Sequence, residues 1–119
     1  MSENFCTINI CDFEYEIADG GLPNVLCMVV YVLDEHLQYV DTIRMWRGDF
    51  GPAPPFDIGP DALFVAYSAW AEMTCFITLG WKFPEHIFDL HTAYLAASNV
   101  LLPHDPNETR NAPAATPKI

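Results

Sequence analysis

Basic residues are scarce in this sequence. Five Lys and Arg stand against sixteen Asp and Glu over 119 residues, which gives a formal net charge of −11 at pH 7. Domains that bind nucleic acid mainly through its phosphates usually carry the opposite balance. The composition therefore argues against a purely electrostatic grip on DNA, and it favours association with a basic partner.

Long hydrophobic runs are missing as well. The longest, residues 26–33, falls far short of the roughly twenty apolar residues that a membrane helix needs. The opening MSENFCTINICD has neither a basic end nor a sustained apolar stretch, so we expect no targeting segment. These features favour a single cytoplasmic domain without a membrane contact.

Cysteine occurs four times and never as a C-x-x-C pair, which gives little support for a zinc site or a redox motif. The four thiols are Cys6, Cys11, Cys27 and Cys75. We expect all of them to be buried and free, in a reducing compartment. None of the four histidines has H-x-x-x-H spacing, so we expect them at the surface or at helix ends rather than on a metal.

Apolar residues make up 51% of the chain, and their spacing predicts strands followed by alternating strands and helices. The expected strands cover residues 7–17, 25–33, 39–46, 62–67 and 86–89, and the expected helices cover 69–79 and 91–101. Ser68 is placed to cap the first helix and Gly80 to end it. The segment at 47–61 is rich in Gly and Pro, which predicts a loop within the domain.

Each expected helix has an apolar stripe that we expect to pack on the sheet. In the first helix the stripe consists of Trp70, Met73, Phe76 and Ile77. In the second it consists of Ala93, Tyr94, Ala97, Val100 and Leu101. We expect residues 1–103 to form the domain, and residues 104–119, which are rich in Pro and poor in large apolar side chains, to form a flexible tail.

Asp12 and Glu14 form the sharpest local feature of the sequence. Alternation along a strand puts both carboxylates on one side, and hard oxygen ligands of this kind suit Mg²⁺ or Mn²⁺. Two acids at this spacing are also typical of a solvated strand face. The motif by itself leaves both interpretations open.

Glu72 adds a third carboxylate, in the first turn of the helix that follows the fourth strand. If the first and fourth strands are adjacent and parallel, Glu72 approaches Asp12 and Glu14 at the carboxyl end of the sheet, where ligand sites of α/β folds gather. Glu72 also complements the helix dipole, a contribution of ~0.3–1 kcal/mol. The two roles are compatible.

Four strings carry a resemblance to a known family: DFE at 12–14, RMWR at 44–47, AYSAWAE at 66–72 and FDLHTA at 88–93. Over residues 8–103 the chain resembles the 3′-to-5′ proofreading exonuclease domain of phage-type family A DNA polymerases, a DEDD domain with a ribonuclease H-like fold. The family's first motif, D-x-E, matches Asp12 and Glu14. Its second, H-N-A-x-F-[DE], ends on Glu72 and has Tyr67 and Ser68 in place of the leading His-Asn.

The resemblance implies two-metal hydrolysis of DNA 3′ ends with Mg²⁺ or Mn²⁺ on Asp12, Glu14 and Glu72, and substrate contacts from Tyr67 and Ser68. The family's third motif, Y-x-x-x-D or H-x-x-x-D, has no counterpart here, so we expect a domain truncated before it. Three carboxylates hold two ions poorly, and at least one should have a raised pKa. We therefore expect weak cation binding and little or no turnover unless a partner completes the site.

The expected fold is an α/β, ribonuclease H-like mixed sheet of five strands in the order 3-2-1-4-5, with two helices and the C-terminal part of the fold missing. The first three strands form an antiparallel meander. Asp89 corresponds to the family's fifth strand and is expected to be structural rather than a ligand. Loss of the family's C-terminal helices would expose an apolar sheet face, which predicts a homo-oligomer through that face.

A second function stays open beside the exonuclease. In it the acidic domain is a non-enzymatic inhibitor or nucleic-acid mimic that binds a basic protein partner. Most aromatic residues are expected in the core, although Trp46 and Phe50, next to Arg44 and Arg47, are placed to stack on a nucleic-acid strand. The partners to consider are thus a DNA 3′ end, a protein, or a second copy of the chain.

Overall fold

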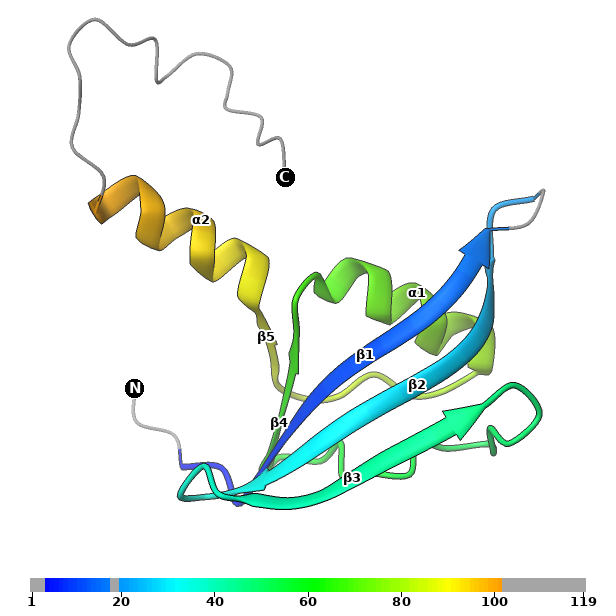
Figure 1. The fold of residues 1–119 in the computed structure, drawn as a ribbon, viewed down its shortest axis with the longest axis horizontal. Helices are drawn as coiled ribbons and strands as arrows, with labels where there is room; N and C mark the ends of the chain where they lie inside the picture. Colours follow the sequence, from blue (N-terminus) through cyan, green and yellow to red (C-terminus); the bar gives the residue numbers. More distant parts are fainter. Residues whose placement is uncertain (1–3, 18–19, 102–119) are drawn as a thin grey trace, which may run out of the picture.

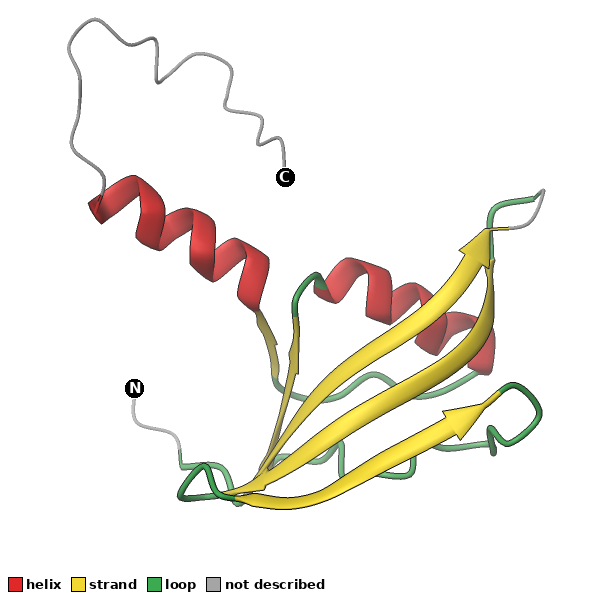
Figure 2. Cartoon of the chain, in the orientation of Figure 1, coloured by secondary structure: helices red, strands yellow, loops and turns green. Residues whose placement is uncertain are grey.

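The chain forms five strands and two helices (Figures 1 and 2), and the computed structural model describes residues 4–17 and 20–101. In chain order the elements are β1 (Thr7–Ile17), β2 (Pro23–Asp34), β3 (Tyr39–Trp46), β4 (Ala62–Ala66), α1 (Ala69–Leu79), β5 (Ile87–Asp89) and α2 (Leu90–Leu101). Every expected element is present, and the boundaries differ by two residues at most.

The strands form one mixed sheet in the order β3-β2-β1-β4-β5, as the sequence predicts. β2 pairs antiparallel with both β1 and β3, while β4 pairs parallel with both β1 and β5. The β1–β4 ladder is short, because Thr7–Ile10 pairs with Ala62–Val65 and β4 then ends at Ala66. The carboxyl half of β1 therefore has no strand beside it on the β4 side among the described residues.

One face of the sheet is covered by α1 and by the loop at 47–61, and the core lies between them and the strands. The buried core consists of Cys11, Phe13, Val25, Met28, Val30, Phe64, Ala66, Met73, Cys75, Phe76 and Trp81. Phe76 is its centre, with edge-to-face contacts to Phe13, Phe64 and Trp81 at ring centroid distances of 6.1, 5.4 and 5.2 Å. The loop adds Phe56, which stacks on Phe64 at 5.9 Å.

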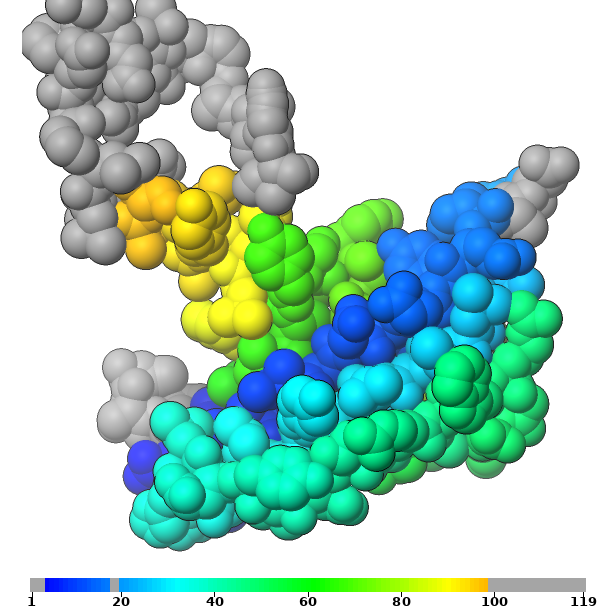
Figure 3. Space-filling model, in the orientation of Figure 1, coloured from blue at the N-terminus to red at the C-terminus, as the bar shows by residue number. Residues whose placement is uncertain are grey.

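The opposite face carries no helix among the described residues. In Figure 1, α1 passes behind β1, and the side of β1, β2 and β3 turned to the viewer is bare; the space-filling view in Figure 3 shows these strands at the surface. We call this surface the open face and define it by Ile8, Ile10, Asp12 and Glu14 of β1, Cys27, Val29, Tyr31 and Leu33 of β2, and Thr42, Arg44 and Trp46 of β3. All of these side chains are exposed or half-buried.

α1 has the expected bounds, but its buried stripe differs from the expected one. Met73 and Phe76 are buried, whereas Trp70 is 76% exposed and Ile77 is 53% exposed. The buried side of the helix instead includes Ala69, Glu72 and Cys75. The prediction failed because it counted only apolar positions, whereas the buried side of the helix also includes the acid Glu72. Gly80 ends the helix with φ of 74°, as expected.

α2 leaves the sheet instead of packing on it (Figure 1). Tyr94 is 59% exposed and Ala97 is exposed, so the prediction that they face inward is wrong. Ala93 is half-buried, and the side chains of Val100 and Leu101 lie outside the described residues. An isolated helix of 12 residues is marginal in water. The first turn of α2 is held by a hydrogen bond of 2.8 Å from the His91 N–H to the carbonyl of Tyr67.

The predictions for the cysteines and for the aromatic residues are also confirmed only in part. All four cysteines are free, but Cys6 is exposed and Cys27 is half-buried, so only Cys11 and Cys75 are buried as expected. Trp46, Trp70, Phe83 and Phe88 are exposed rather than in the core. The expected tail at 104–119 lies outside the described residues. No helix of the described part is both long and apolar enough to cross a membrane.

Candidate functional site

Asp12 and Glu14 lie on the open face, one residue on each side of Phe13. Their side chains are exposed, while Phe13 points into the core on the other side of β1. The β1–β2 register shifts between Glu14 and Tyr15, where Leu26 of β2 has no partner. Bulges of this kind re-aim neighbouring side chains and are common next to functional sites.

Glu72 reaches this segment from α1. Its side chain is buried, with 5% exposure, and its Oε1 accepts a hydrogen bond of 3.1 Å from the backbone N–H of Phe13. Phe13 is the middle residue of the D-x-E motif. The hydrogen bond brings the Glu72 carboxylate to the backbone of the first acidic motif, 59 residues earlier in the sequence, while the Asp12 and Glu14 side chains lie on the open face.

The sheet topology explains why the carboxylate is there. β4 ends opposite Ile10, and the chain turns into α1, so the N–H of Phe13 has no strand to donate to on that side. A buried N–H without an acceptor costs about 1–3 kcal/mol. Glu72 supplies the acceptor from the first turn of α1, and this need explains why the buried side of the helix includes an acid.

Burial raises the pKa of Glu72 to about 7. The hydrogen bond from Phe13 opposes this shift, and the negative charges of Asp12 and Glu14 add to it. The expected raised carboxyl pKa is therefore found on Glu72. The raised pKa favours the protonated form of Glu72, and this form competes with cation binding.

The donor chemistry suits Mg²⁺ or Mn²⁺, but the arrangement is incomplete. The carboxylates of Asp12 and Glu14 are exposed and accept no hydrogen bond among the described residues, so both are free to bind a cation. Glu72, by contrast, is engaged by Phe13. In residues 4–17 and 20–101, no three His, Cys, Asp or Glu side chains are arranged to hold one metal ion. The residues do not form a ready three-ligand centre.

Tyr67 and Ser68, the two residues that take the place of His-Asn in the second motif, connect β4 to α1. Tyr67 is 53% exposed, and its ring packs against His91 with centroids 5.3 Å apart. Ser68 occupies the N-cap position of α1, but its hydroxyl makes no cap hydrogen bond. The expected cap is thus right in position and wrong in chemistry, and the hydroxyl is free for another partner.

Asp89 does the capping instead. Its Oδ2 accepts from the N–H of Ala69 at 3.1 Å, and its Oδ1 accepts from the N–H of Thr92 at 3.0 Å. Burial opposes ionisation of this carboxyl, but the N–H groups of Thr92 and Ala69 bring its pKa below the ordinary value. One carboxylate thus caps the first turns of both helices, which agrees with the structural role that the sequence predicts for Asp89.

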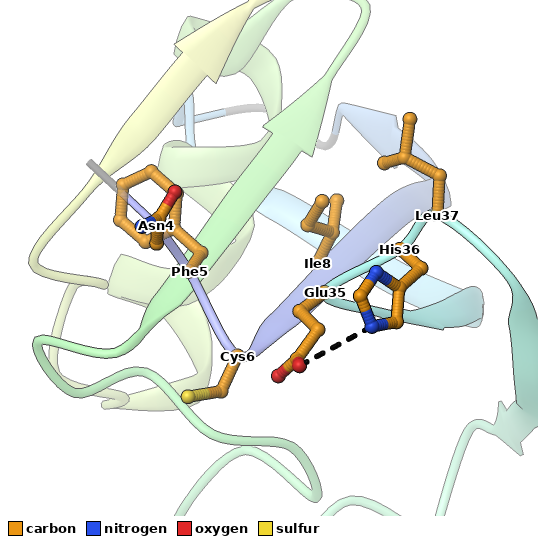
Figure 4. Close-up of a pocket in the computed structure, with 7 residues that line it drawn as sticks. All are labelled: Asn4, Phe5, Cys6, Ile8, Glu35, His36 and Leu37. Carbon is orange, nitrogen blue, oxygen red and sulfur yellow. Dashed lines mark ion pairs between the residues drawn. The ribbon is translucent and has the colours of Figure 1, made fainter. Parts of the chain in front are cut away.

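One pocket of the structure lies away from these residues. It has a volume of about 560 Å³ and is lined by Asn4, Phe5, Cys6, Ile8, Glu35, His36 and Leu37 (Figure 4). These residues come from the amino end of β1 and from the β2–β3 turn. Ligand sites of α/β folds gather at the carboxyl ends of the parallel strands instead. Its one ion pair, between His36 and Glu35 at 3.4 Å, is exposed and worth little.

Two features of the site were not predicted from the sequence. The first is that the Phe13 N–H donates to Glu72. The shortness of β4, which leaves this N–H without a strand partner, was the signal in the sequence that could have indicated it. The second is a pair of buried thiols near Glu72: burial, together with the Glu72 charge, raises the pKa of Cys11 and raises that of Cys75 to about 12. Both thiols are therefore protonated and unreactive.

Comparison of the chain with protein-family models, with curated proteins and with solved structures returned no match.

Proposed function

We propose that this chain is a 3′-to-5′ exonuclease-like domain that engages DNA 3′ ends and hydrolyses them slowly or not at all. The supporting observation is the hydrogen bond between the Phe13 N–H and Glu72, because it joins the second acidic motif of the exonuclease pattern to the middle of the first. The strand order β3-β2-β1-β4-β5, with β4 and β5 parallel to β1, supports a ribonuclease H-like fold.

The expected rate is low for two reasons. Glu72 has a raised pKa and already accepts a hydrogen bond from Phe13, which weakens it as a ligand, so a cation relies mainly on Asp12 and Glu14. The described part of these 119 residues also offers no fourth carboxylate beside Asp12, Glu14 and Glu72. Mg²⁺ or Mn²⁺ then binds weakly. Tyr67 and Ser68, which are not used as caps, are the residues we assign to the DNA end.

A nuclease assay tests the proposed activity. We would incubate the protein, in excess, with 5′-labelled single-stranded DNA and Mn²⁺, alongside an Asp12→Ala, Glu14→Ala double variant. Slow shortening from the 3′ end that the double variant lacks is the expected result. The matched control is Asp61→Asn, Glu85→Gln, two exposed acids that accept no side-chain hydrogen bond among the described residues. Intact DNA at protein excess would rule out hydrolysis by this chain alone.

Cation binding is measured separately by thermal unfolding. With a dissociation constant of ~1 mM, 10 mM Mn²⁺ stabilises the folded state by about 1.4 kcal/mol, which raises Tm by several degrees. Asp12→Asn, Glu14→Gln should abolish this rise, and the Asp61, Glu85 control should keep it. An equal rise in all three proteins would mean that the cation binds elsewhere.

A second candidate function is suggested by the surface charge. The described residues include nine exposed Asp and Glu but only three exposed Arg and Lys. Most of these acids lie outside the site. This excess supports a non-enzymatic role as an inhibitor or nucleic-acid mimic on a basic protein. A partner bound in this way should dissociate in about 0.5 M salt, where charges are screened within a few ångströms. The free thiols support a cytoplasmic setting for either role.

A further inference from the structure

The open face consists of rows that run across β1, β2 and β3. The ladder registers give Ile10–Tyr31–Thr42, Asp12–Val29–Arg44 and Glu14–Cys27–Trp46 as three consecutive rows. In each row the β2 residue is in the middle. The face is therefore apolar along β2, acidic at the carboxyl end of β1 and basic at Arg44 on β3.

Arg44 has no carboxylate within ion-pair distance among the described residues, although it lies in the same row as Asp12. Two strand spacings separate them, which is about 10 Å between their backbones. The two side chains do not pair within the chain in this structure. They lie at opposite ends of a row whose centre is the half-buried Val29.

A two-fold rotation about an axis parallel to β2 brings these charges together. It places a second copy face to face with the first, with β1 of each copy over β3 of the other and β2 over β2. Because Asp12 and Arg44 share a row with Val29, the rotation puts Asp12 of each copy opposite Arg44 of the other. One operation satisfies both pairs, as an isologous interface requires.

The alternative face-to-face axis, perpendicular to the strands, lacks this complementarity. It places β1 over β1, so the acids at positions 12 and 14 of the two copies approach each other while Arg44 meets Arg44. Like charges across an interface are unfavourable. The charge distribution therefore selects the axis along β2.

We propose that a second copy of this chain covers the open face, through a two-fold axis parallel to β2. Val29 packs on Val29 and Tyr31 on Tyr31 at the axis, and Asp12–Arg44 pairs flank it on both sides. Face-to-face sheets pack about 10 Å apart, a distance that side chains from both sheets fill. Tyr31 at 51% exposure and Trp46 at 66% then lose contact with water.

The dimer is of the weak, reversible kind. Ile8 and Leu33 form a fourth row beside the three above. Three strands spaced by about 4.8 Å and four rows spaced by about 6.8 Å give a footprint on the order of 400 Å² per copy. This area falls in the low size class of specific interfaces, at about 800 Å² in total. We expect a dissociation constant between about 1 µM and 1 mM.

This inference does not depend on the proposed nuclease activity. Asp12 cannot serve a cation and the Arg44 of a second copy at the same time, so the dimer is the metal-free form. The test is therefore made in EDTA and reads molecular mass rather than activity. Failure of the dimer leaves the nuclease proposal standing, and the reverse also holds.

Complementary charge variants test the arrangement by sedimentation velocity at protein concentrations up to about 1 mM. Asp12→Lys places a lysine opposite the Arg44 of a second copy, and Arg44→Glu places an acid opposite its Asp12. Each variant alone should dimerise at least about tenfold more weakly than the parent, because like charges meet twice. An equimolar mixture of the two should restore association to within about threefold of the parent, because every pair in the mixed dimer is then of opposite sign.

Glu85→Lys and Lys82→Glu are the matched controls. They make the same charge changes at exposed positions between α1 and β5, away from the open face, and should dimerise like the parent. Circular dichroism checks that all variants fold. A parent that stays monomeric near 1 mM overturns the proposal and assigns the open face to a different occupant. Variants that are weakened but not rescued by mixing overturn the two-fold arrangement.

Discussion

The two faces of the sheet are built from the same strands, yet they differ in what covers them. Phe13, Met28 and Val30 point to one side and are buried under α1 and the loop at 47–61. Ile10, Val29 and Tyr31 alternate with them, point to the other side and remain in contact with water. β2 is thus apolar on both sides, but only one side is covered by other parts of the described chain.

This difference shows what residue alternation does and does not specify. The run from 25 to 33 predicts a central strand because it is apolar on both sides, and β2 is indeed flanked by β1 and β3. Which side is covered depends on where the chain turns after β4. α1 begins at Ala69 and lies over Phe13 and Phe64, and within the described residues no second helix returns to the other side.

Removing one large aromatic residue from each surface should separate the two faces most clearly. Phe76→Ala empties the centre of the covered core, and we expect the free energy of unfolding to fall by about 3–5 kcal/mol. Trp46→Ala on the open face should change it by less than about 1 kcal/mol. Urea unfolding at a protein concentration of about 0.1 µM, below the expected range of the dimer dissociation constant, measures both. Equal losses would mean that the open face is covered within a single chain.

Glu72 is the acid that lies on the covered side of the sheet. Replacing it by Gln should change how the free energy of unfolding depends on pH. The folded pKa of about 7 lies above the ordinary value of 4.5, so the folded state holds the proton through this window and the unfolded state does not. The free energy of unfolding of the parent therefore falls as pH rises from about 5 to about 8, by ~2–3 kcal/mol. Gln cannot ionise, and it keeps an acceptor for the Phe13 N–H.

Urea unfolding at a series of pH values makes the comparison. We expect Glu72→Gln to match the parent near pH 5 and to exceed its stability near pH 8 by the same ~2–3 kcal/mol. Glu85→Gln, at an exposed site, should follow the parent at every pH. Parallel profiles for the parent and Glu72→Gln would contradict a raised pKa at this position.

The strand boundaries could be predicted because their determinants are local, whereas the strand order was expected from the family resemblance. Strand periodicity, the acidic β2–β3 connection and the Gly and Pro residues of the loop specify where each strand starts and stops. The helix faces could not be predicted in the same way. Trp70 and Ile77 have helical spacing with Met73 and Phe76, but the buried side of α1 also has to present Glu72 to the Phe13 N–H. A hydrogen bond between segments that are distant in sequence thus helps to determine which side of α1 is buried, and the spacing of apolar residues does not show it.

The site could be expected from the sequence only in part. A parallel β1–β4 pair makes it expected that Glu72 lies beside the strand of Asp12 and Glu14, and its carboxylate does accept from the Phe13 N–H. The burial of Glu72 and its hydrogen bond could not be expected, because they depend on β4 ending opposite Ile10, and Asp12 and Glu14 point to the open face instead. Asn9 shows the same limit: it lies fully buried on the covered side, where its amide donates to the carbonyl of Asp57, 48 residues away.

Asp89 connects the two helices, so its removal compares their first turns. Asp89→Ala leaves the N–H groups of Ala69 and Thr92 without their acceptor, and we expect a loss of about 1–2 kcal/mol at pH 7. The folded pKa lies below the ordinary value, so the stabilisation is present at neutral pH and disappears as pH falls below about 4. Urea unfolding at pH 7 and at low pH measures this, with Asp61→Ala as the exposed control. A loss that persists at low pH would argue against capping by the carboxylate.

The smallest expected change in stability is for a substitution in α2. It is compared with the same substitution in α1, which packs on the sheet whereas α2 projects from it. Ala→Gly in a helix interior costs about 1 kcal/mol, but the cost reaches the global free energy of unfolding only if the helix unfolds together with the core. Ala71→Gly in α1 should lower global stability by this amount, whereas Ala96→Gly in α2 should leave it within about 0.3 kcal/mol and reduce only the helical circular dichroism signal. Trp81 fluorescence reports the core, because this side chain is buried against Phe76. Equal losses would mean that α2 is coupled to the core, and a loss for Ala96→Gly that grows with protein concentration would place α2 in an interface between copies.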